Sequence, residues 1–202
     1  MTETELYKSL GTLTKSRDQW RENIAYVGSL LHGHTTKITA KALWMLGEMG
    51  LVYPKAVTDF VPSIAGFLTD EEALLRERAL NALGRIGRAD HEIVIPYLGD
   101  MLSQSSDKAP NVRLSLIWAA ENIATNTPDV CRNNMEFFAE LLSDPDERVR
   151  MEAPEIFRVL GKRQPELVRP YLEKLIFISE NDPNRVVRIH AAGAIKAAEK
   201  PQ

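Results

Sequence analysis

The chain has little of several features that would place it in a special class. Its 202 residues include one cysteine, Cys131, which excludes an internal disulfide. No stretch approaches the roughly 18 uninterrupted apolar residues of a membrane span. The start, MTETELYKSLGTL, lacks the basic and apolar regions of a secretory signal, so we expect a cytoplasmic location.

Neither sign of charge dominates. The 25 Lys and Arg residues oppose 28 Asp and Glu, and the net charge of -3 gives no general attraction to nucleic acid or acidic lipid. Hydrophobic residues make up 44% of the chain, which is enough for a sizeable buried core. The composition therefore indicates an ordered globular protein and selects no partner.

Motifs that carry chemistry are also missing. The sequence has no Gly-rich phosphate loop, no nucleophile elbow and no cysteine pair. His32 and His34 stand close together, but two ligands without a third are more typical of a solvated loop than of a metal site. Cys131 occupies the register position of Val57 and Val168, which predicts a buried small hydrophobe. We therefore predict no metal, no cofactor and no catalysis.

A repeat of about 37 residues fills the chain. Its copies read ITAKALWMLGEMG from Ile38, LRERALNALGRIG from Leu75, VRLSLIWAAENIA from Val112, VRMEAPEIFRVLG from Val149 and VRIHAAGAIKAAE from Val187. The second position is an arginine in four copies, with intervals of 37, 37 and 38 residues, and Thr39 in the first. We therefore expect a single domain over 1–202, with a degraded repeat in 1–34 and four to five helix pairs in 35–200.

Each copy predicts an amphipathic helix, here called helix B. Apolar residues fall at positions 1, 5, 8, 9 and 12 of the copy, which is a helical and not a strand period. Between the copies lies a second helical pattern, helix A, often opened by a proline such as Pro54, Pro128 or Pro165. One repeat is thus two antiparallel helices. Pro154 falls inside a B helix and is expected to bend it by removing a backbone donor.

The turn between helices A and B carries the most specific marker, an aspartate six residues before the arginine. The pairs are Asp70 and Arg76, Asp107 and Arg113, Asp144 and Arg150, and Asp182 and Arg188. Together with the period and the prolines inside helix A, this pattern resembles the HEAT repeat family, including the HEAT-like repeats named after phycobilisome lyases, a name that describes fold. The resemblance implies an all-α, right-handed α-solenoid. It also implies that each Asp caps helix B, and that each Arg makes a two-pronged contact with a carboxylate.

In solenoids of this family the B helices line the concave face, so their positions outside the core predict the binding surface. Positions 4, 7 and 11 of the copies are Lys41, Trp44 and Glu48; Arg78, Asn81 and Arg85; Ser115, Trp118 and Asn122; Glu152, Glu155 and Val159; and His190, Gly193 and Ala197. The two tryptophans share position 7. Each ring either completes the core or anchors a partner, and the sequence leaves both interpretations open.

Charges on this surface change sign along the chain. Arg78, Arg85 and Arg88 lie between the tryptophans in sequence, whereas Glu152 and Glu155 follow them. A groove that runs from basic to acidic suits an extended peptide or a partner helix better than a duplex, so we expect a non-catalytic protein-interaction scaffold. The expected partner-binding residues are Lys41, Trp44, Arg78, Arg85, Arg88, Trp118, Asn122, Glu152 and Glu155.

One alternative is a nucleic-acid-binding protein. HEAT-like alkylpurine DNA glycosylases use tryptophans and an acidic residue on a concave face, and Trp44 with Glu48 is similar to that arrangement. The acidic Glu152 and Glu155 and the lack of a wider cationic track argue against it, and we expect neither nucleic acid nor membrane as a partner. The alanine-rich C-terminal helix, with no helix A after it, makes self-association a further expectation.

Overall fold

The computed structural model describes residues 2–199, which form α-helices and 3₁₀ helices and no strand. Contacts between residues divide the chain into two compact units, one ending at Met101 and the other beginning at Leu102. The all-α class predicted from the helical periodicity is confirmed.

The N-terminal unit begins with two helices and continues with two repeats. Its elements are α1 (Glu3–Lys15), η1 (Arg17–Gln19), α2 (Trp20–Ser29), α3 (Thr36–Val52), α4 (Pro54–Val57), η2 (Thr58–Phe60), α5 (Val61–Gly66), η3 (Phe67–Thr69), α6 (Ala73–Ala89), η4 (His91–Ile93) and η5 (Ile95–Tyr97), followed by α7 (Leu98–Ser103) at the division.

The C-terminal unit holds the last three B helices. Its elements are η6 (Gln104–Ser106), α8 (Pro110–Asn126), η7 (Pro128–Cys131), α9 (Met135–Leu141), α10 (Glu147–Gly161), η8 (Pro165–Leu167), η9 (Arg169–Tyr171), α11 (Leu172–Asn181) and α12 (Arg185–Glu199).

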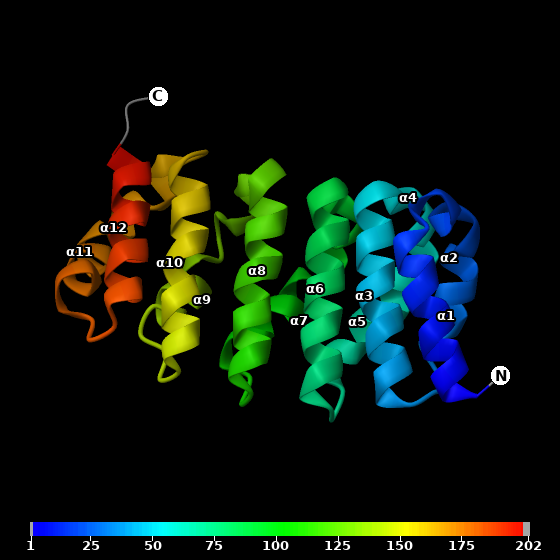
Figure 1. Cartoon of the computed structure of the whole chain (residues 1–202). Helices are drawn as coiled ribbons and strands as arrows, with labels where there is room; N and C mark the ends of the chain where they lie inside the picture. The colour runs from blue at the N-terminus through cyan, green and yellow to red at the C-terminus, as the bar shows by residue number, and fades with distance from the viewer. Residues whose placement is uncertain (1, 200–202) are drawn as a thin grey trace. The chain divides into compact units, whose positions relative to one another are not determined.

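The B helices are α3, α6, α8, α10 and α12, and each begins two residues before the first apolar position of its copy. Within the N-terminal unit, α6 packs along α3, and α1 and α2 also contact α3 (Figure 1). Within the C-terminal unit, α10 packs between α8 and α12, and α11 covers α12 (Figure 1). The apolar positions of the repeat form the core, as Leu75, Ala79, Leu83 and Ile86 of α6 show by their burial.

The A segments are not continuous helices, which differs from the prediction. Each is divided into short α-helical and 3₁₀ pieces, such as α4, η2, α5 and η3 in the first. Pro62, Pro96 and Pro170 lie at the first positions of such pieces. Proline cannot donate a backbone hydrogen bond to the preceding turn, so the chain restarts its helical bonding at each of these residues.

Pro154 has a milder effect than these prolines. It is buried inside α10, and this helix runs without a break over Glu147–Gly161. Packing of α10 against its two neighbouring B helices holds the helix together across the missing hydrogen bond. The bend expected at this position stays a prediction.

In the C-terminal unit two of the repeated arginines contact the aspartate of the next turn, and Arg113 does so in the two-pronged way that the resemblance implied. Nε and one terminal nitrogen of Arg113 donate to the two carboxylate oxygens of Asp144, over 2.6 and 2.7 Å. Arg150 Nε donates to Asp182 over 3.0 Å. The other terminal nitrogen of Arg113 donates to the backbone carbonyl of Asp107, over 2.6 Å. Each of these arginines therefore connects its own turn to the next one.

The aspartates have a different role from the predicted cap. The side chain of Asp70 accepts from the backbone N–H of Glu72 over 2.8 Å, and Asp144 accepts from that of Asp146 over 2.8 Å. Glu72 and Asp146 are themselves the N-cap residues of α6 and α10. The aspartates thus close the turn that precedes helix B, because a short carboxylate bonds readily to the backbone two residues further on.

The close approach of α3 to α6 depends on Gly47. A Cβ atom at this position would lie 2.7 Å from the Cα of Ala82, so Gly47→Ala should push the two helices apart and lower the free energy of unfolding by roughly 1–2 kcal/mol. Gly11→Ala in α1 is the matched control, because its Cβ meets nothing within 4 Å and alanine favours the helix by up to about 1 kcal/mol. Urea unfolding followed by circular dichroism measures both. Equal effects of the two substitutions would contradict the packing argument.

Candidate functional site

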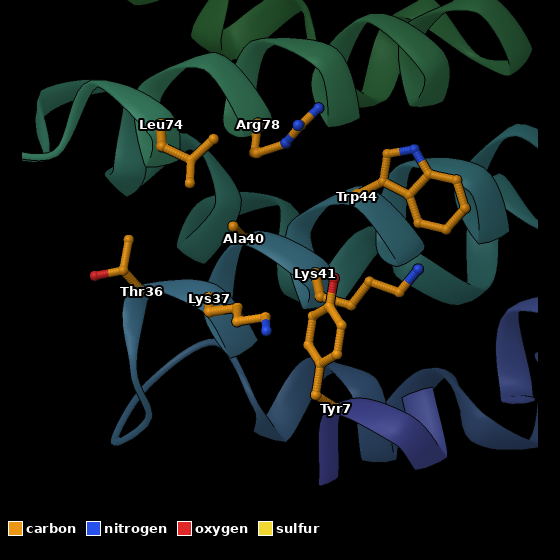
Figure 2. Close-up of a pocket in the computed structure, with 8 residues that line it drawn as sticks. All are labelled: Tyr7, Thr36, Lys37, Ala40, Lys41, Trp44, Leu74 and Arg78. Atoms are coloured by element: carbon orange, nitrogen blue, oxygen red, sulfur yellow. The ribbon is translucent and has the colours of Figure 1, made fainter. Parts of the chain in front are cut away.

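A pocket of about 530 Å³ lies on the surface of the N-terminal unit where α1, α3 and α6 meet (Figure 2). It is lined by Tyr7 from α1, by Thr36, Lys37, Ala40, Lys41 and Trp44 from α3, and by Leu74 and Arg78 from α6. Lys41, Trp44 and Arg78 are three of the residues predicted to bind a partner. The structure therefore brings these three together on one surface.

Two lysines of the pocket lie over aromatic rings. The ammonium nitrogen of Lys41 is 4.1 Å from the centre of the Trp44 ring, and that of Lys37 is 4.2 Å from the centre of the Tyr7 ring. Such contacts are electrostatically favourable, because the face of an aromatic ring is negative. Each pair therefore presents a cation and a large apolar surface side by side (Figure 2).

The lining contains three cations and no carboxylate. Neither Lys37 nor Lys41 forms an ion pair with a carboxylate in the described part of the chain. Burial and the nearby charge of Arg78 lower the pKa of Lys41 below its ordinary value, and only Glu48 opposes this shift. The guanidinium of Arg78 is 3.4 Å from Glu77, the residue before it. The pocket thus concentrates positive charge that the protein itself leaves largely uncompensated.

Two other predicted basic residues lie outside this pocket. Arg85 donates through Nε to Glu48 over 2.6 Å, which joins α6 to α3. Arg88 is exposed near the end of α6. Glu48 is the acidic residue that, with Trp44, is similar to the arrangement in the DNA glycosylases, and its carboxylate is paired with Arg85.

Five lining residues were not predicted from the sequence, three of them polar or aromatic and two apolar. Lys37 and Leu74 stand just before the apolar start of their copies, one helical turn before position 4 and two turns before position 7. Extending the helical period back by one turn would have found them. Tyr7 lies on α1 within the degraded N-terminal repeat, so the clear copies did not predict its exposure of 37%. The remaining missed residues are Thr36 and Ala40.

The predicted binding surface is wrong at two residues. Asn81, at position 7 of the second copy, and Ser115, at position 4 of the third, are both buried. The buried faces of helices α6 and α8 are wide enough to include these two side chains. Asn81 and Ser115 each have a polar partner. The structure answers the open question about the tryptophans differently for each. Trp118 is 39% exposed on α8, whereas Trp44 is half-buried in the pocket lining. Asn122 donates to the carbonyl of Trp118 over 2.9 Å, which fixes its own side chain on the helix surface.

The predicted acidic residues form a cluster in the C-terminal unit. Burial raises the pKa of Glu121 on α8 to about 8, and the nearby charges of Glu152 and Glu155 on α10 add to this rise. Glu155 accepts a hydrogen bond from Arg158 over 2.6 Å, so its charge is compensated in part. One carboxylate oxygen of Glu121 is buried without a hydrogen-bond partner in the described residues. The expected run from basic to acidic along one groove stays a prediction.

The remaining candidate residues have local structural roles. His34 lies 3.0 Å from Glu3, and His32 stacks on Phe67 with ring centres 5.4 Å apart. No group of three or more His, Cys, Asp or Glu side chains among residues 2–199 is placed to hold a metal ion. Cys131 is buried as expected, and burial raises the pKa of its thiol to about 12.

None of the helices within residues 2–199 combines the length and the hydrophobicity that crossing a bilayer requires.

Comparison with solved structures supports a helical-repeat fold. A designed armadillo repeat protein, solved in complex with the peptide (KR)4, is 19% identical, with a TM-score of 0.73 over 98% of this chain and 94% of that one. An engineered protein from a structural genomics consortium is 14% identical, with a TM-score of 0.71 over 96% of this chain and 84% of that one. Computationally designed armadillo repeat proteins for modular peptide recognition give 16% identity, a TM-score of 0.64, and coverage of 96% and 98%. The predicted all-α solenoid fold is thereby confirmed.

Comparison of the sequence gives the family. No curated protein matches the chain. A family model described as sister chromatid cohesion protein PDS5 matches residues 18–192, which is most of the chain and includes all five B helices except the last residues of α12. The HEAT-like repeats recognised from the arginine and aspartate spacing agree with this match. The chain therefore belongs to the family of the sister chromatid cohesion protein PDS5.

Proposed function

We propose that this protein is a non-catalytic interaction module that binds an extended segment of a partner protein on the exposed face of its B helices. The observation that carries the proposal is the pocket between α1, α3 and α6, in which Trp44 and Tyr7 offer apolar surface beside three cations. Tryptophan, tyrosine and arginine are the residues that most often dominate the energy of protein interfaces. In the C-terminal unit, the exposed ring of Trp118 supplies a second anchor.

The similar solved structures support a peptide as the ligand. One of them is a designed armadillo repeat protein in complex with a peptide, and others were designed for modular peptide recognition. A stack of helix pairs suits this task, because side chains at the same position of successive repeats face a ligand at regular intervals.

Two observations favour binding over catalysis. Glu48, the acidic residue that a glycosylase-like site would need, is engaged by Arg85 at 2.6 Å. Cys131 is buried with a raised thiol pKa, so the side chain is not a ready nucleophile. Nothing specific in the geometry favours the nucleic-acid alternative, and it is not proposed. Self-association through α12, on which Val186 and Ile189 are exposed, and a cytoplasmic location remain predictions.

Selection from a random peptide library displayed on phage tests the module. We expect wild-type protein to enrich peptides, and Trp44→Ala with Trp118→Ala to lose at least about tenfold in affinity for them, since buried aromatic anchors contribute about 2 kcal/mol or more. Phe177→Ala is the matched control, because this ring is 66% exposed on α11 and outside the B helices. Circular dichroism establishes that the variants are folded. Enrichment that is unchanged in the double variant would show that the B-helix face is the wrong surface, and a library without enriched peptides would contradict the module itself.

A further inference from the structure

We propose that the pocket between α1, α3 and α6 binds carboxylate side chains, so that the partner segment is an extended acidic peptide with apolar residues among its acidic ones. This inference rests on the proposed function and specifies the chemistry of its ligand.

The first observation concerns the charge inside the pocket. Lys37, Lys41 and Arg78 all line it, and the lining has no acidic side chain. The ammonium groups of the two lysines lie over aromatic rings and form no ion pair with a carboxylate of the described residues. Arg78 and burial both disfavour the charged form of Lys41. A carboxylate placed among these groups would relieve that repulsion, because an opposite charge within a few ångströms favours the charged form.

The second observation concerns the carboxylates around the pocket. Glu48 is bound by Arg85 at 2.6 Å and acts on Lys41 only through its charge. Glu3 of α1, which lines a neighbouring pocket with Tyr7 and Lys37, is 3.0 Å from His34 and accepts a hydrogen bond from Thr35 over 2.6 Å. Glu77 lies 3.4 Å from the guanidinium of Arg78 and compensates its charge in part. The charges of the two lysines are therefore available to a ligand.

The third observation concerns the apolar surface beside the cations. Tyr7 and Leu74 are 37% and 38% exposed, and the Trp44 ring belongs to the same lining (Figure 2). An extended peptide places successive side chains on opposite sides, so its carboxylates and apolar side chains reach the cations and the rings in turn. The designed relative that was solved with (KR)4 carries a basic peptide. The cations of this pocket predict the opposite peptide charge.

A single strand of nucleic acid fits the pocket less well. Lys37 and Lys41 already cover one face of the Tyr7 and Trp44 rings, which reduces the surface on which bases could stack. Two other cations of this unit, Lys55 and Arg85, are paired with Asp90 and Glu48, each over 2.6 Å. These two charges are therefore compensated within the protein and do not extend the cationic pocket into a track for a phosphate backbone.

Fluorescence anisotropy with labelled peptides tests the inference. Three short peptides have leucines at the same positions and are otherwise all Glu, all Gln or all Lys, and single-stranded oligothymidine is the fourth probe. The full chain is compared with Lys41→Glu/Arg78→Glu. A matched control is Lys162→Glu/Arg163→Glu, which makes the same change in net charge at two exposed residues of the C-terminal unit.

We expect the Glu peptide to bind at least about tenfold more tightly than the Gln peptide, with an affinity that falls as salt is raised. The pocket variant should lose this preference by about tenfold or more and gain binding of the Lys peptide, whereas the control variant should behave as wild type. New binding of the Lys peptide by the pocket variant would show that the substitutions changed its specificity and did not unfold it.

The other outcomes separate the two proposals. If the Gln or Lys peptide binds wild type as tightly as the Glu peptide, the acidic preference is wrong and the interaction module stands. If the pocket variant keeps the Glu preference, the pocket is the wrong site. If no peptide binds, the proposed function fails, and binding of oligothymidine alone would replace it with nucleic-acid recognition.

Discussion

Arg113→Ala should lower the free energy of unfolding of the C-terminal unit by about 3–5 kcal/mol. Arg113 and Asp144 are 8% and 6% exposed, and the guanidinium bonds to both carboxylate oxygens and to the carbonyl of Asp107. Removal of the arginine leaves the Asp144 carboxylate buried without its counter-charge and leaves a carbonyl without its donor. The large effect comes mainly from leaving a buried charge and a carbonyl without their partners, and not from the strength of the ion pair alone.

Arg132→Ala is the control for this prediction. Arg132 also bonds to a carboxylate, that of Asp129 over 2.8 Å, but both side chains are about half exposed or more. Exposed pairs contribute about 0–1 kcal/mol, so the control should change stability little. Arg113→Lys should give an intermediate loss, since an ammonium group cannot make the two-pronged contact. Urea unfolding followed by tryptophan fluorescence, together with hydrogen exchange of α8 and α10, measures the effect. Equal losses for Arg113→Ala and Arg132→Ala would refute it.

Glu121→Gln should remove a pH dependence from stability. Burial, then Glu152 and Glu155, raise the pKa of Glu121 to about 8, against 4.5 for an ordinary glutamate. Between these two values the folded protein keeps a proton that the unfolded chain releases, so raising the pH favours unfolding. The free energy of unfolding of wild type should therefore fall by roughly 3–5 kcal/mol from pH 4.5 to 8 through this one group.

The glutamine variant cannot ionise, so it should be nearly as stable as wild type at pH 4.5 and more stable by a few kcal/mol at pH 8. Glu140→Gln, at an exposed position of α9, is the control and should leave the pH dependence of wild type in place. Chemical unfolding across this pH range tests the prediction. A wild-type profile that is flat between pH 5 and 8, or identical to that of Glu121→Gln, would contradict the raised pKa.

The repeated helices could be predicted from the sequence, because their causes are local and recur. Apolar residues at fixed positions of each copy make one face of a helix, and those positions are buried throughout α6. The resemblance to HEAT repeats, recognised from the spacing of aspartate and arginine, implied a two-pronged contact of each arginine with a carboxylate, and Arg113 makes this contact with Asp144.

The division of the A segments was not predicted from the same pattern. Pro62, Pro96 and Pro170 were visible in the sequence, but an apolar period is the same for a continuous helix and for short α and 3₁₀ pieces in succession. Hydrogen bonding decided between them, because each proline lacks the donor that would have continued the helix.

The sequence by its periodicity established the family of helical repeats and named Lys41, Trp44 and Arg78 as surface residues. Only tertiary structure decided that these three share a pocket with Tyr7, Lys37 and Leu74, and that Arg85 binds Glu48. The pocket joins residues from three helices far apart in the sequence. Which charges meet depends on the distance and rotation at which the helices pack, and side-chain volumes across the interface set both.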